Sequence, residues 1–209
     1  MARSEADEDL LRTTRREAVL RAARKVFEKK GLEGASIRMI ATAAKCTTGA
    51  IYPYFKGKEE IYAEVLSRSL ESWRRALVAD IEAARTPEKR FEAALVSHFT
   101  WYAERPNDLS LALYLFNGLK PQGLTRELDA QLNSQLKSIL AIYSTLLREI
   151  AGFNERDAEV EVGVHFAMLF GLLTLYHTKR TRVFGIDARS ILDHFIAQSV
   201  QRLSRAGSA

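Results

Sequence analysis

Apolar residues recur at intervals of three and four along most of this sequence, and that spacing constrains the fold more than any other feature. The clearest case spans residues 128–150, with intervals of 4, 4, 3, 4, 3 and 4. Its members are Leu128, Leu132, Leu136, Ile139, Tyr143, Leu146 and Ile150. Side chains at this spacing form one face of an α-helix. Strand-type alternation, internal repeats and low-complexity segments are absent from the sequence. We therefore predict an all-α fold.

Prolines and glycines are scarce, at 4 and 11 of 209 residues, and they punctuate the apolar stretches. Gly31 supplies the stop that a helix C-terminus favours, and Ser36 and Thr47 are suitable N-caps for the two helices that follow. The predicted helices are residues 13–30, 37–44, 47–55, 58–85, 87–105, 109–119, 128–150, 155–178 and 187–204.

Positive charge is concentrated near the N-terminus. Residues 1–58 contain 13 Lys/Arg and 7 Asp/Glu, whereas residues 59–209 contain 18 and 19. Within residues 10–58 the numbers are 12 and 3. Such a block attracts the phosphate backbone of a nucleic acid through counterion release and steering. Charge alone is also compatible with a solvated basic face that has no partner.

The helices predicted at residues 37–44 and 47–55 are separated by a short turn, which is the layout of a helix-turn-helix. In this motif the second helix enters the major groove of DNA with its N-terminal residues against the base edges. Ile51 and Phe55 lie four apart, and we expect them to anchor that helix to its neighbours. The sequence therefore predicts a DNA-binding segment between about residues 36 and 58.

Polar side chains occupy the rest of this segment. Thr47 and Thr48 lie at the helix start, where hydroxyls and free backbone N–H groups meet bases and phosphates. The phenol hydroxyls of Tyr52 and Tyr54 can donate to phosphate oxygens. Lys58 adds a cation at the start of the next helix. These last three residues are predicted to hold phosphates rather than to read sequence.

Residues 36–61, SIRMIATAAKCTTGAIYPYFKGKEEI, resemble the DNA-binding head of the TetR family of transcriptional regulators. The matching types include Ile40-Ala41, Ala44 and Gly49-Ala-Ile-Tyr52. With upstream Ala22, Phe27 and Gly31, the resemblance covers roughly residues 13–62. The C-terminal part resembles the family in length and helical layout alone.

The resemblance implies individual roles. Arg38, Thr47, Thr48 and Ala50 match positions that approach bases, while Tyr52, Tyr54 and Lys58 match positions that touch phosphates. The residues expected to face DNA are Ser36, Arg38, Thr47, Thr48, Gly49, Ala50, Tyr52, Pro53, Tyr54 and Lys58. The family also implies a DNA-binding domain at residues 1–58, with a disordered tail at 1–12, and a ligand-binding and dimerisation domain at 59–209.

Two residues of the segment allow a second interpretation. Pro53 departs from the family pattern, and in a helix it removes a hydrogen bond and clashes with the carbonyl of Gly49. We therefore expect a local distortion of the reading helix. Cys46 lies beside that helix and could sense redox conditions, but a small apolar residue in the turn is the simpler interpretation.

The C-terminal part offers a surface for a homodimer. The helix at residues 155–178 is apolar on nearly all sides, whereas a surface helix should have a polar face. Burial on both sides follows if one side packs in its own chain and the other on a partner. A central helix buried within the monomer is the alternative. In the dimer interpretation, this helix and the last helix of each chain would together form a four-helix interface, as in the TetR family. The expected interface residues are Gly163, Ala167, Gly171, Leu192 and Phe195.

The family resemblance also implies a small-molecule effector. The candidate lining consists of aromatic and isolated polar residues on apolar helices: His98, Trp101, Tyr102, Tyr114, Phe116, Asn117, Tyr143, His165, Phe166 and Tyr176. Each of them is also what an ordinary core contains. Residues 93–103, 109–119 and 162–178 contain no Asp or Glu. Because a cation would need a buried carboxylate or an aromatic cage, we expect a neutral or anionic, largely apolar ligand.

Other classes of protein find less support. The apolar run at residues 160–176 is interrupted and short for a membrane span, and the single cysteine excludes an internal disulfide. We expect a cytoplasmic protein that does not bind membranes, with palindromic double-stranded DNA as partner. No phosphate loop or nucleophile elbow indicates an enzyme, and no cofactor is expected. Glu161 and His165 are a possible metal pair without a third ligand. A ligand-independent architectural DNA-binding protein remains the alternative function.

Overall fold

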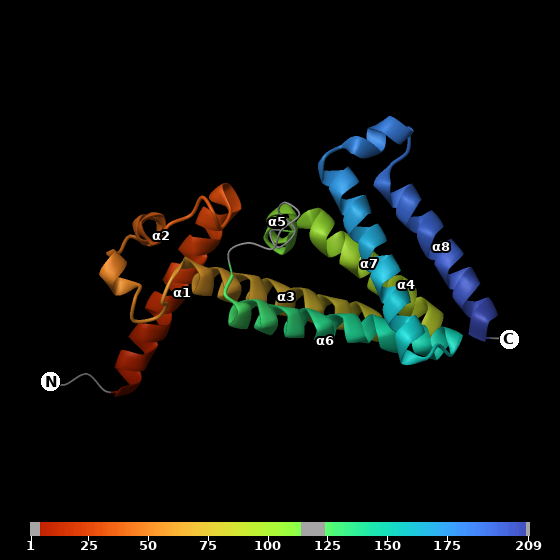
Figure 1. The fold of residues 1–209 in the computed structure, drawn as a ribbon, viewed down its shortest axis with the longest axis horizontal. Helices are drawn as coiled ribbons and strands as arrows, with labels where there is room; N and C mark the ends of the chain where they lie inside the picture. The colour runs from red at the N-terminus through yellow and green to blue at the C-terminus, as the bar shows by residue number, and fades with distance from the viewer. Residues whose placement is uncertain (1–4, 114–123, 208–209) are drawn as a thin grey trace. The chain divides into compact units, whose positions relative to one another are not determined.

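The computed structural model describes residues 5–113 and 124–207, and within these ranges the chain is helical without a strand (Figure 1). The all-α prediction is confirmed. The elements are α1 (Glu5–Lys30), α2 (Ile37–Ala44), the 3₁₀ turn η1 (Thr48–Ala50), α3 (Lys58–Glu82), α4 (Pro87–Glu104), α5 (Pro106–Leu113), α6 (Arg126–Ala151), α7 (Glu155–His177), the 3₁₀ turn η3 (Arg180–Phe184) and α8 (Ala188–Gly207).

The described chain forms two compact units. Of the described residues, the first comprises 5–69, 107–113 and 124–133, and the second comprises 70–106 and 134–207. The sequence suggested a boundary after Lys58, where α3 begins, whereas the compact units divide within α3, after Ser69. Contacts made by α5 explain the difference, because Asp108 pairs with Arg24 of α1 and Tyr62 of α3 donates to the carbonyl of Leu111 at 2.6 Å.

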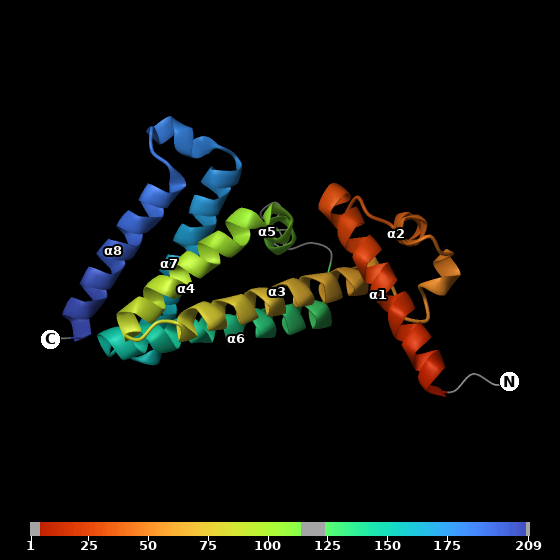
Figure 2. The same cartoon turned by 180° about the vertical axis from the view of Figure 1, so that it is seen from behind.

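The first unit is built around the face where α1 meets α2 (Figure 2). Ala23, Leu32 and Ile40 have no exposed surface there, and Phe27 is 3% exposed. Gly31 ends α1 with φ +65°, a left-handed conformation that glycine adopts without strain. Residues 5–12 were predicted to be a disordered tail, but they form the start of α1 instead. Acidic side chains at this end favour the helix because they complement its dipole.

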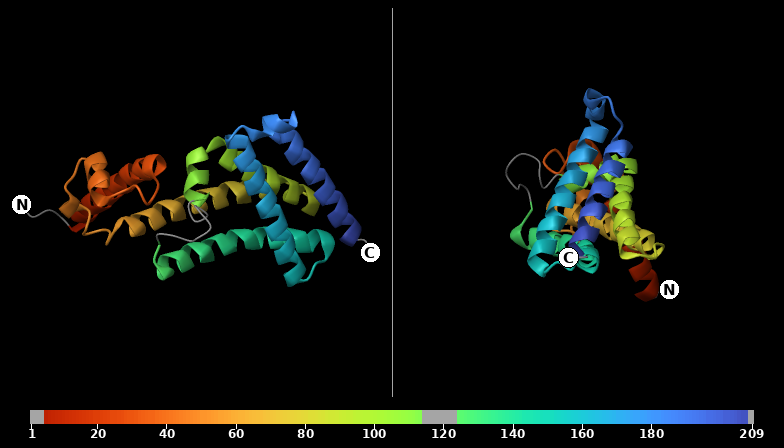
Figure 3. Two further views of the ribbon diagram at one scale, coloured as in Figure 1. Left: turned by 45° about the horizontal axis from the view of Figure 1, so that its top comes forward. Right: turned by 90° about the vertical axis from the view of Figure 1, so that its right-hand side faces the viewer.

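The second unit packs α4 against α7 and α8, which are themselves neighbours (Figures 1 and 3). Phe91, Leu95, Leu173 and Leu192 are fully buried in this core. Thr86 caps α4 by accepting a hydrogen bond from the amide of Lys89 at 3.3 Å, and a proline follows at the first helical position. Local signals in the sequence therefore define the starts of the helices that carry this core.

By length and composition alone, α7 could cross a membrane. From the sequence alone, the interrupted apolar run at residues 160–176 is too short for a span. One third of its most apolar window is buried within the chain. Its other side carries exposed Val160 and Val164. Glu161 accepts from both Nη atoms of Arg202 in α8, at 2.7 and 2.6 Å. A helix with one side packed against its own chain and an ion pair to α8 is typical of a core helix.

Candidate DNA interface and effector cavity

Local capping positions α2. Ser36 has extended backbone, and its Oγ accepts from the amide of Met39 at 3.3 Å, as predicted for an N-cap. The helix ends where Lys45 enters the left-handed region at φ 55° and the amide of Cys46 donates to the carbonyl of Ala41 at 3.0 Å. This turn redirects the chain into the segment predicted to read DNA.

The reading segment is a tight turn rather than the α-helix predicted for residues 47–55. The 3₁₀ turn η1 covers Thr48–Ala50, and the amides of Ala50 and Ile51 donate three residues back at 3.1 Å each. Pro53 explains the change, because in an α-helix its ring would meet the carbonyl of Gly49. Ile51 and Phe55 are 0% and 2% exposed, so the predicted anchors do hold the turn against the core of the first unit.

Most of the predicted DNA contacts lie on the surface of this segment. Tyr52 is 57% exposed. The hydroxyl of Thr47, at the cap position of η1, makes no capping hydrogen bond. The exposed members of the predicted set are Ser36, Arg38, Thr47, Thr48, Gly49, Ala50, Tyr52 and Pro53, and the half-buried ones are Tyr54 and Lys58. A turn with buried anchors and exposed polar groups can present donors to the edges of a DNA groove.

Lys58 has a second role that the sequence did not reveal. Its Nζ donates to the carbonyls of Leu32, Ala35 and Glu33 at 2.9, 3.2 and 3.4 Å. These carbonyls belong to the loop between α1 and α2. An ammonium has three donors, and all three are engaged here. Lys58 therefore ties this loop to the start of α3, and a phosphate contact would require it to release part of that arrangement.

Sequence reasoning also missed a buried acidic group. Asp108 of α5 is 5% exposed and pairs with the Nη2 of Arg24 at 2.8 Å. Ser69 of α3 donates to its other oxygen. The partners are 84 and 39 positions away along the chain, so no local pattern could indicate them. This cluster joins three helices of the first unit.

A second ionic network links α1 to α3. Arg68 contacts both carboxylate oxygens of Glu17 at 2.6 and 2.7 Å, and Arg16 approaches Glu64 at 3.2 Å. The hydrogen bond from Arg68 lowers the pKa of Glu17. The network is partly exposed and so adds little stability, but it fixes the register between the two helices.

A groove of about 520 Å³ runs beside the reading segment. Arg15 and Lys45 line it together with Cys46, Pro53 and Tyr54. Cys46 is half-buried. Arg15 is exposed on α1 and was not among the predicted contacts. It adds a cation to the groove that Pro53 and Tyr54 line.

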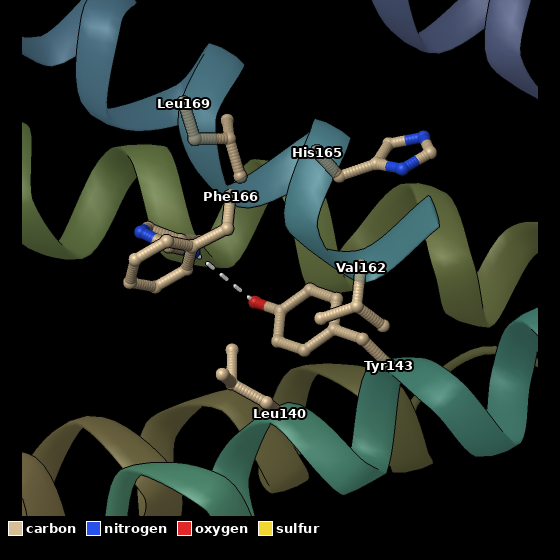
Figure 4. A pocket seen from close by; sticks show the side chains of 7 residues that line it. Leu140, Tyr143, Val162, His165, Phe166 and Leu169 are labelled. Carbon is tan, nitrogen blue, oxygen red and sulfur yellow. Dashed lines mark hydrogen bonds between the residues drawn. The ribbon is translucent and has the colours of Figure 1, made fainter. Parts of the chain in front are cut away.

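The second unit brings four of the predicted effector residues together around one small cavity (Figure 4). The lining residues are His98, Leu140, Tyr143, Val162, His165, Phe166 and Leu169. The cavity volume is about 10 Å³, which is the room that a single water molecule needs. The side chains are collapsed on one another, so a ligand must displace them to enter.

The remaining predicted effector residues are dispersed. Tyr102 is buried, with its ring 5.5 Å from that of His98, and therefore belongs to the same cluster. Trp101 is half-buried beneath the guanidinium of Arg105, at 4.0 Å. Tyr176 is 43% exposed and packs on Phe99. Tyr114, Phe116 and Asn117 lie outside the described residues.

Two further aromatic residues join the cluster without having been predicted. Trp73 of α3 is fully buried, with its ring centroid 4.7 Å from that of His98. Phe170 of α7 lies 4.5 Å from Phe166 and 5.5 Å from His98 by the same measure. Tryptophan within a helix is what a core contains, so the sequence carried no signal separating Trp73 from ordinary packing.

Burial controls the charges in this cluster. It lowers the pKa of His98 to about 3, and it is also the main cause that lowers the pKa of His165. It raises the pKa of Tyr143 well above 10. Both imidazoles and the phenol are therefore neutral near pH 7. The cavity presents hydrogen-bonding groups without charge, in line with the expected apolar ligand.

An open groove of about 500 Å³ lies between α6 and α7. Leu140, Val162 and Phe166 line both this groove and the buried cavity. Lys137 and Arg148 of α6 and Glu155 and Glu159 of α7 also line the groove.

The predicted dimer residues differ in exposure. Gly163, Ala167 and Gly171 are exposed on α7, and an added Cβ on either glycine would meet only open space. Phe195 is half-buried, with its ring 5.2 Å from that of His165. Leu192 is fully buried in its own chain, so it has no side-chain surface to offer a partner, and we remove it from the expected interface.

The possible metal pair has other partners. Glu161 pairs with Arg202, and the Nδ1 of His165 lies 2.7 Å from the backbone carbonyl of Glu161. In the part of the chain that is described, no three His, Cys, Asp or Glu side chains gather as a metal site.

Known proteins resemble the chain in sequence and in fold. Residues 19–65 match the model of the bacterial regulatory proteins of the tetR family. The fatty acid metabolism regulator protein of Bacillus subtilis (strain 168) is 26% identical over 155 residues, which are 74% of this chain and 77% of that protein. The HTH-type transcriptional regulator TtgW of Pseudomonas putida is 32% identical over 39% of this chain and 72% of its own.

Among solved structures, the transcriptional regulator FadR from Bacillus subtilis in complex with stearoyl-CoA superposes with a TM-score of 0.68 at 22% identity. The alignment covers 91% of this chain and 98% of that one. The likeness therefore extends from the helix-turn-helix through the helices of the second unit.

Proposed function

The chain belongs to the TetR family of bacterial transcriptional regulators, and from this premise we propose that it is a repressor that leaves a palindromic operator when a small, largely apolar molecule enters its second unit. One observation carries the DNA-binding part of the proposal. Thr47, Thr48 and Tyr52 are exposed on a turn that is anchored by buried Ile51 and Phe55. Polar groups held rigidly at a surface are what base and phosphate recognition requires.

The residues of the head divide into two functional groups. Arg38, Thr47 and Thr48 are proposed to approach bases, while Tyr52 and Tyr54 donate to phosphates. Lys58 acts first as a positioning residue, because its ammonium holds the loop between α1 and α2. Residues 1–58 would thus supply the DNA-binding function and residues 59–209 the ligand and dimer functions, even though the compact units divide within α3.

A homodimer is the second element of the proposal. Val160, Val164, Ala167, Gly171 and Thr174 are all exposed, and they follow one another at intervals of 4, 3, 4 and 3. This is the seam spacing of paired helices, and small residues allow a partner helix to approach closely. The opposite stripe of α7 is already buried in its own chain. Two heads of a dimer would reach successive major grooves about 34–36 Å apart.

The dimer can be tested by charge. Val164→Glu places a carboxylate on the exposed stripe of α7 and should convert the dimer to monomer in sedimentation equilibrium. Ala79→Glu adds the same charge at an exposed position of α3 and serves as control. The monomeric variant should lose at least ~100-fold in operator affinity, because each head then binds a half-site alone. A Val164→Glu protein that stays dimeric would place the interface elsewhere.

The effector is proposed to be a neutral or anionic, mainly apolar compound. The cavity is lined mostly by apolar and aromatic side chains, and its histidines are uncharged at neutral pH. Acyl compounds are the first class to test, since relatives include a fatty acid metabolism regulator and a structure solved with stearoyl-CoA. Movement of Phe166 would admit such a ligand from the groove between α6 and α7.

Release of DNA would follow from a change in population. A ligand can shift the protein toward a conformer with mis-spaced heads only by binding that conformer more tightly. Helix α3 begins beside the head at Lys58 and carries Trp73 of the aromatic cluster farther along. It is therefore the element through which an opened cavity would act on the reading segment. The protein is proposed to work in the cytoplasm, where its DNA lies.

Selection from a random duplex library tests the whole proposal. We expect recovery of a palindrome with two half-sites, bound at least ~1,000-fold more tightly than unrelated DNA. Thr48→Ala should relax preference at one position of each half-site, whereas Tyr52→Phe should weaken all sequences alike. Recovery of no palindrome, together with a steep salt dependence on any duplex, would favour the architectural alternative.

A further inference from the structure

Four buried nitrogen atoms in the described residues have no hydrogen-bond partner: Nε1 of Trp73, Nε2 of His98, Nε1 of Trp101 and Nε2 of His165. All four lie in the second unit. Native proteins leave few such groups, because each one costs on the order of 1–3 kcal/mol when it is unpaired. The rings of Trp73 and His98 touch edge to face at 4.7 Å. An unpaired donor and an unpaired nitrogen therefore occur on neighbouring side chains.

The proton on His98 can be assigned from its neighbours. The hydroxyl of Tyr143 donates to the carbonyl of Ala94 at 3.2 Å, and a carbonyl can only accept. The same hydroxyl oxygen lies 3.4 Å from Nδ1 of His98, so the proton between them belongs to Nδ1 (Figure 4). A neutral imidazole carries one proton. Nε2 of His98 is then a bare acceptor.

His165 has the same tautomer by a separate argument. Its Nδ1 lies 2.7 Å from the backbone carbonyl of Glu161 and must donate to it. In Figure 4 the His165 ring points away from Tyr143 and Leu140. It contacts Phe91 and Phe195 instead, with ring centroids 5.0 and 5.2 Å away. His98 is therefore the better placed of the two to meet a molecule that enters between Tyr143 and Phe166.

The cavity beside His98 is small and adjoins a larger groove. It has room for about one water molecule, and Leu140, Val162 and Phe166 separate it from the groove between α6 and α7. A water there would have few polar partners, since the other lining residues are leucine, valine and phenylalanine apart from Tyr143 and His165. The unpaired atoms are thus better matched by a group carried on a larger apolar molecule.

Resting on the proposed effector function, we propose that the effector carries a neutral hydroxyl, as an alcohol, a phenol or an un-ionised carboxylic acid, which donates to Nε2 of His98. A hydroxyl supplies the proton that a bare acceptor lacks, and it brings no charge into the buried site. A carboxylate or a thioester carbonyl only accepts and leaves His98 unpaired. A cation would be buried without a carboxylate among the lining residues.

Two matched ligand pairs test the hydroxyl. Phenol and toluene differ by a hydroxyl in place of a methyl group at nearly equal size. Decan-1-ol and decanoate have the same alkyl chain length, but only the alcohol can donate a hydrogen bond from its polar end at pH 7. We expect the hydroxyl compound to bind at least tenfold more tightly in calorimetry in at least one pair. In Trp101→Phe protein, Trp73 is the only tryptophan, and its emission should shift when the hydroxyl compound binds.

Variants of His98 separate the hydrogen bond from packing. His98→Leu removes the acceptor at similar volume and should abolish the preference for the hydroxyl compound. His98→Gln places an oxygen near the position of Nε2 and should restore part of it. Circular dichroism checks that both variants fold; if His98→Leu does not, the His98→Phe variant supplies the comparison, because it removes the acceptor and keeps an aromatic ring.

The outcomes distinguish this inference from the function on which it rests. A hydroxyl preference that disappears in His98→Leu supports the inference. No hydroxyl preference in either pair, including no binding at all, overturns it. A preference unchanged in His98→Leu, or in His98→Phe where His98→Leu does not fold, overturns it as well. If the selected palindrome is bound but released only by decanoate, the effector function stands and the hydroxyl assignment fails. If no palindrome is bound with or without these compounds, the proposed function fails first.

Discussion

In the first unit Thr48 and Tyr52 are exposed, while Ile51 and Phe55 from the same turn are buried. In the second unit His98 and Tyr143, which line the candidate effector cavity, are themselves core residues at 1% and 3% exposure. In the first unit, the side chains proposed to bind DNA therefore differ from those that stabilise the fold. In the second unit, the same side chains are proposed to bind the effector and to stabilise the fold. Surface substitutions in the head should change binding alone, and substitutions at the cavity should change stability and ligand response together.

The largest effect is expected in the reading turn, where a buried anchor can be replaced separately from an exposed side chain. Phe55→Ala deletes a fully packed ring and should lower the free energy of unfolding by ~3–5 kcal/mol. Tyr52→Phe, three residues earlier, removes only an exposed hydroxyl and should leave stability within ~0.5 kcal/mol while weakening DNA binding. Urea denaturation and anisotropy on the same samples measure both. Equal destabilisation by the two variants would show that the turn does not divide its roles in this way.

In the second unit, the stabilising role of His98 should appear in how the free energy of unfolding depends on pH. The folded protein holds the pKa of His98 near 3, below its ordinary value of 6.5, so the unfolded chain takes up the proton first. The stability contributed by the neutral imidazole is complete above pH 6.5 and is lost as the pH falls toward 3. The expected slope from this residue is ~1.4 kcal/mol per pH unit.

The pH effect is measured as a difference between proteins. Urea denaturation between pH 7 and pH 5 should show a shallower loss in His98→Phe than in the parent chain. His165 keeps its own contribution in both proteins, because burial also lowers its pKa. Parallel pH profiles would mean that His98 takes up its proton in the folded state as readily as in the unfolded chain.

An intermediate effect is expected at the buried carboxylate of the first unit, Asp108. Asp108→Asn keeps the size of the side chain but removes its charge from Arg24, and it should cost ~1–3 kcal/mol of stability. Glu28→Gln removes the other partner of Arg24, an i,i+4 pair at 3.1 Å, and should cost at most ~0.5 kcal/mol. Base preference in the duplex selection should be unchanged in both. A shift of base preference in Asp108→Asn would connect this cluster directly to the reading turn.

The smallest effect compares matched caps in the two units. Ser36 and Thr86 each accept from the amide three residues on at 3.3 Å. Replacement of either by alanine should cost ~1 kcal/mol in thermal unfolding. Only Ser36→Ala should also weaken operator binding, because Ser36 begins the helix-turn-helix. Equal effects of both substitutions on DNA affinity would indicate that affinity follows overall stability.

The sequence alone determined the features that depend on neighbours a few positions apart. The spacing of apolar residues predicted the helices, with α4 and α7 placed to within one residue of their ends. Ser36 and Gly31 marked the cap and the stop around α2 and α1. The Ile51–Phe55 spacing predicted the buried anchors of the reading turn, and the charge imbalance indicated which end of the chain meets DNA.

Only the tertiary structure decided the contacts between distant segments. Lys58 was predicted to hold phosphate, but its ammonium binds the carbonyls of a loop more than 20 residues earlier. Asp108 pairs with Arg24 across 84 positions, and Trp73 meets His98 in the aromatic cluster. Leu192 carried the same apolar signal as Phe195, yet it is fully buried. Periodicity tells which face of a helix is apolar, but it does not say which partner covers that face, because packing depends on how the helices are brought together.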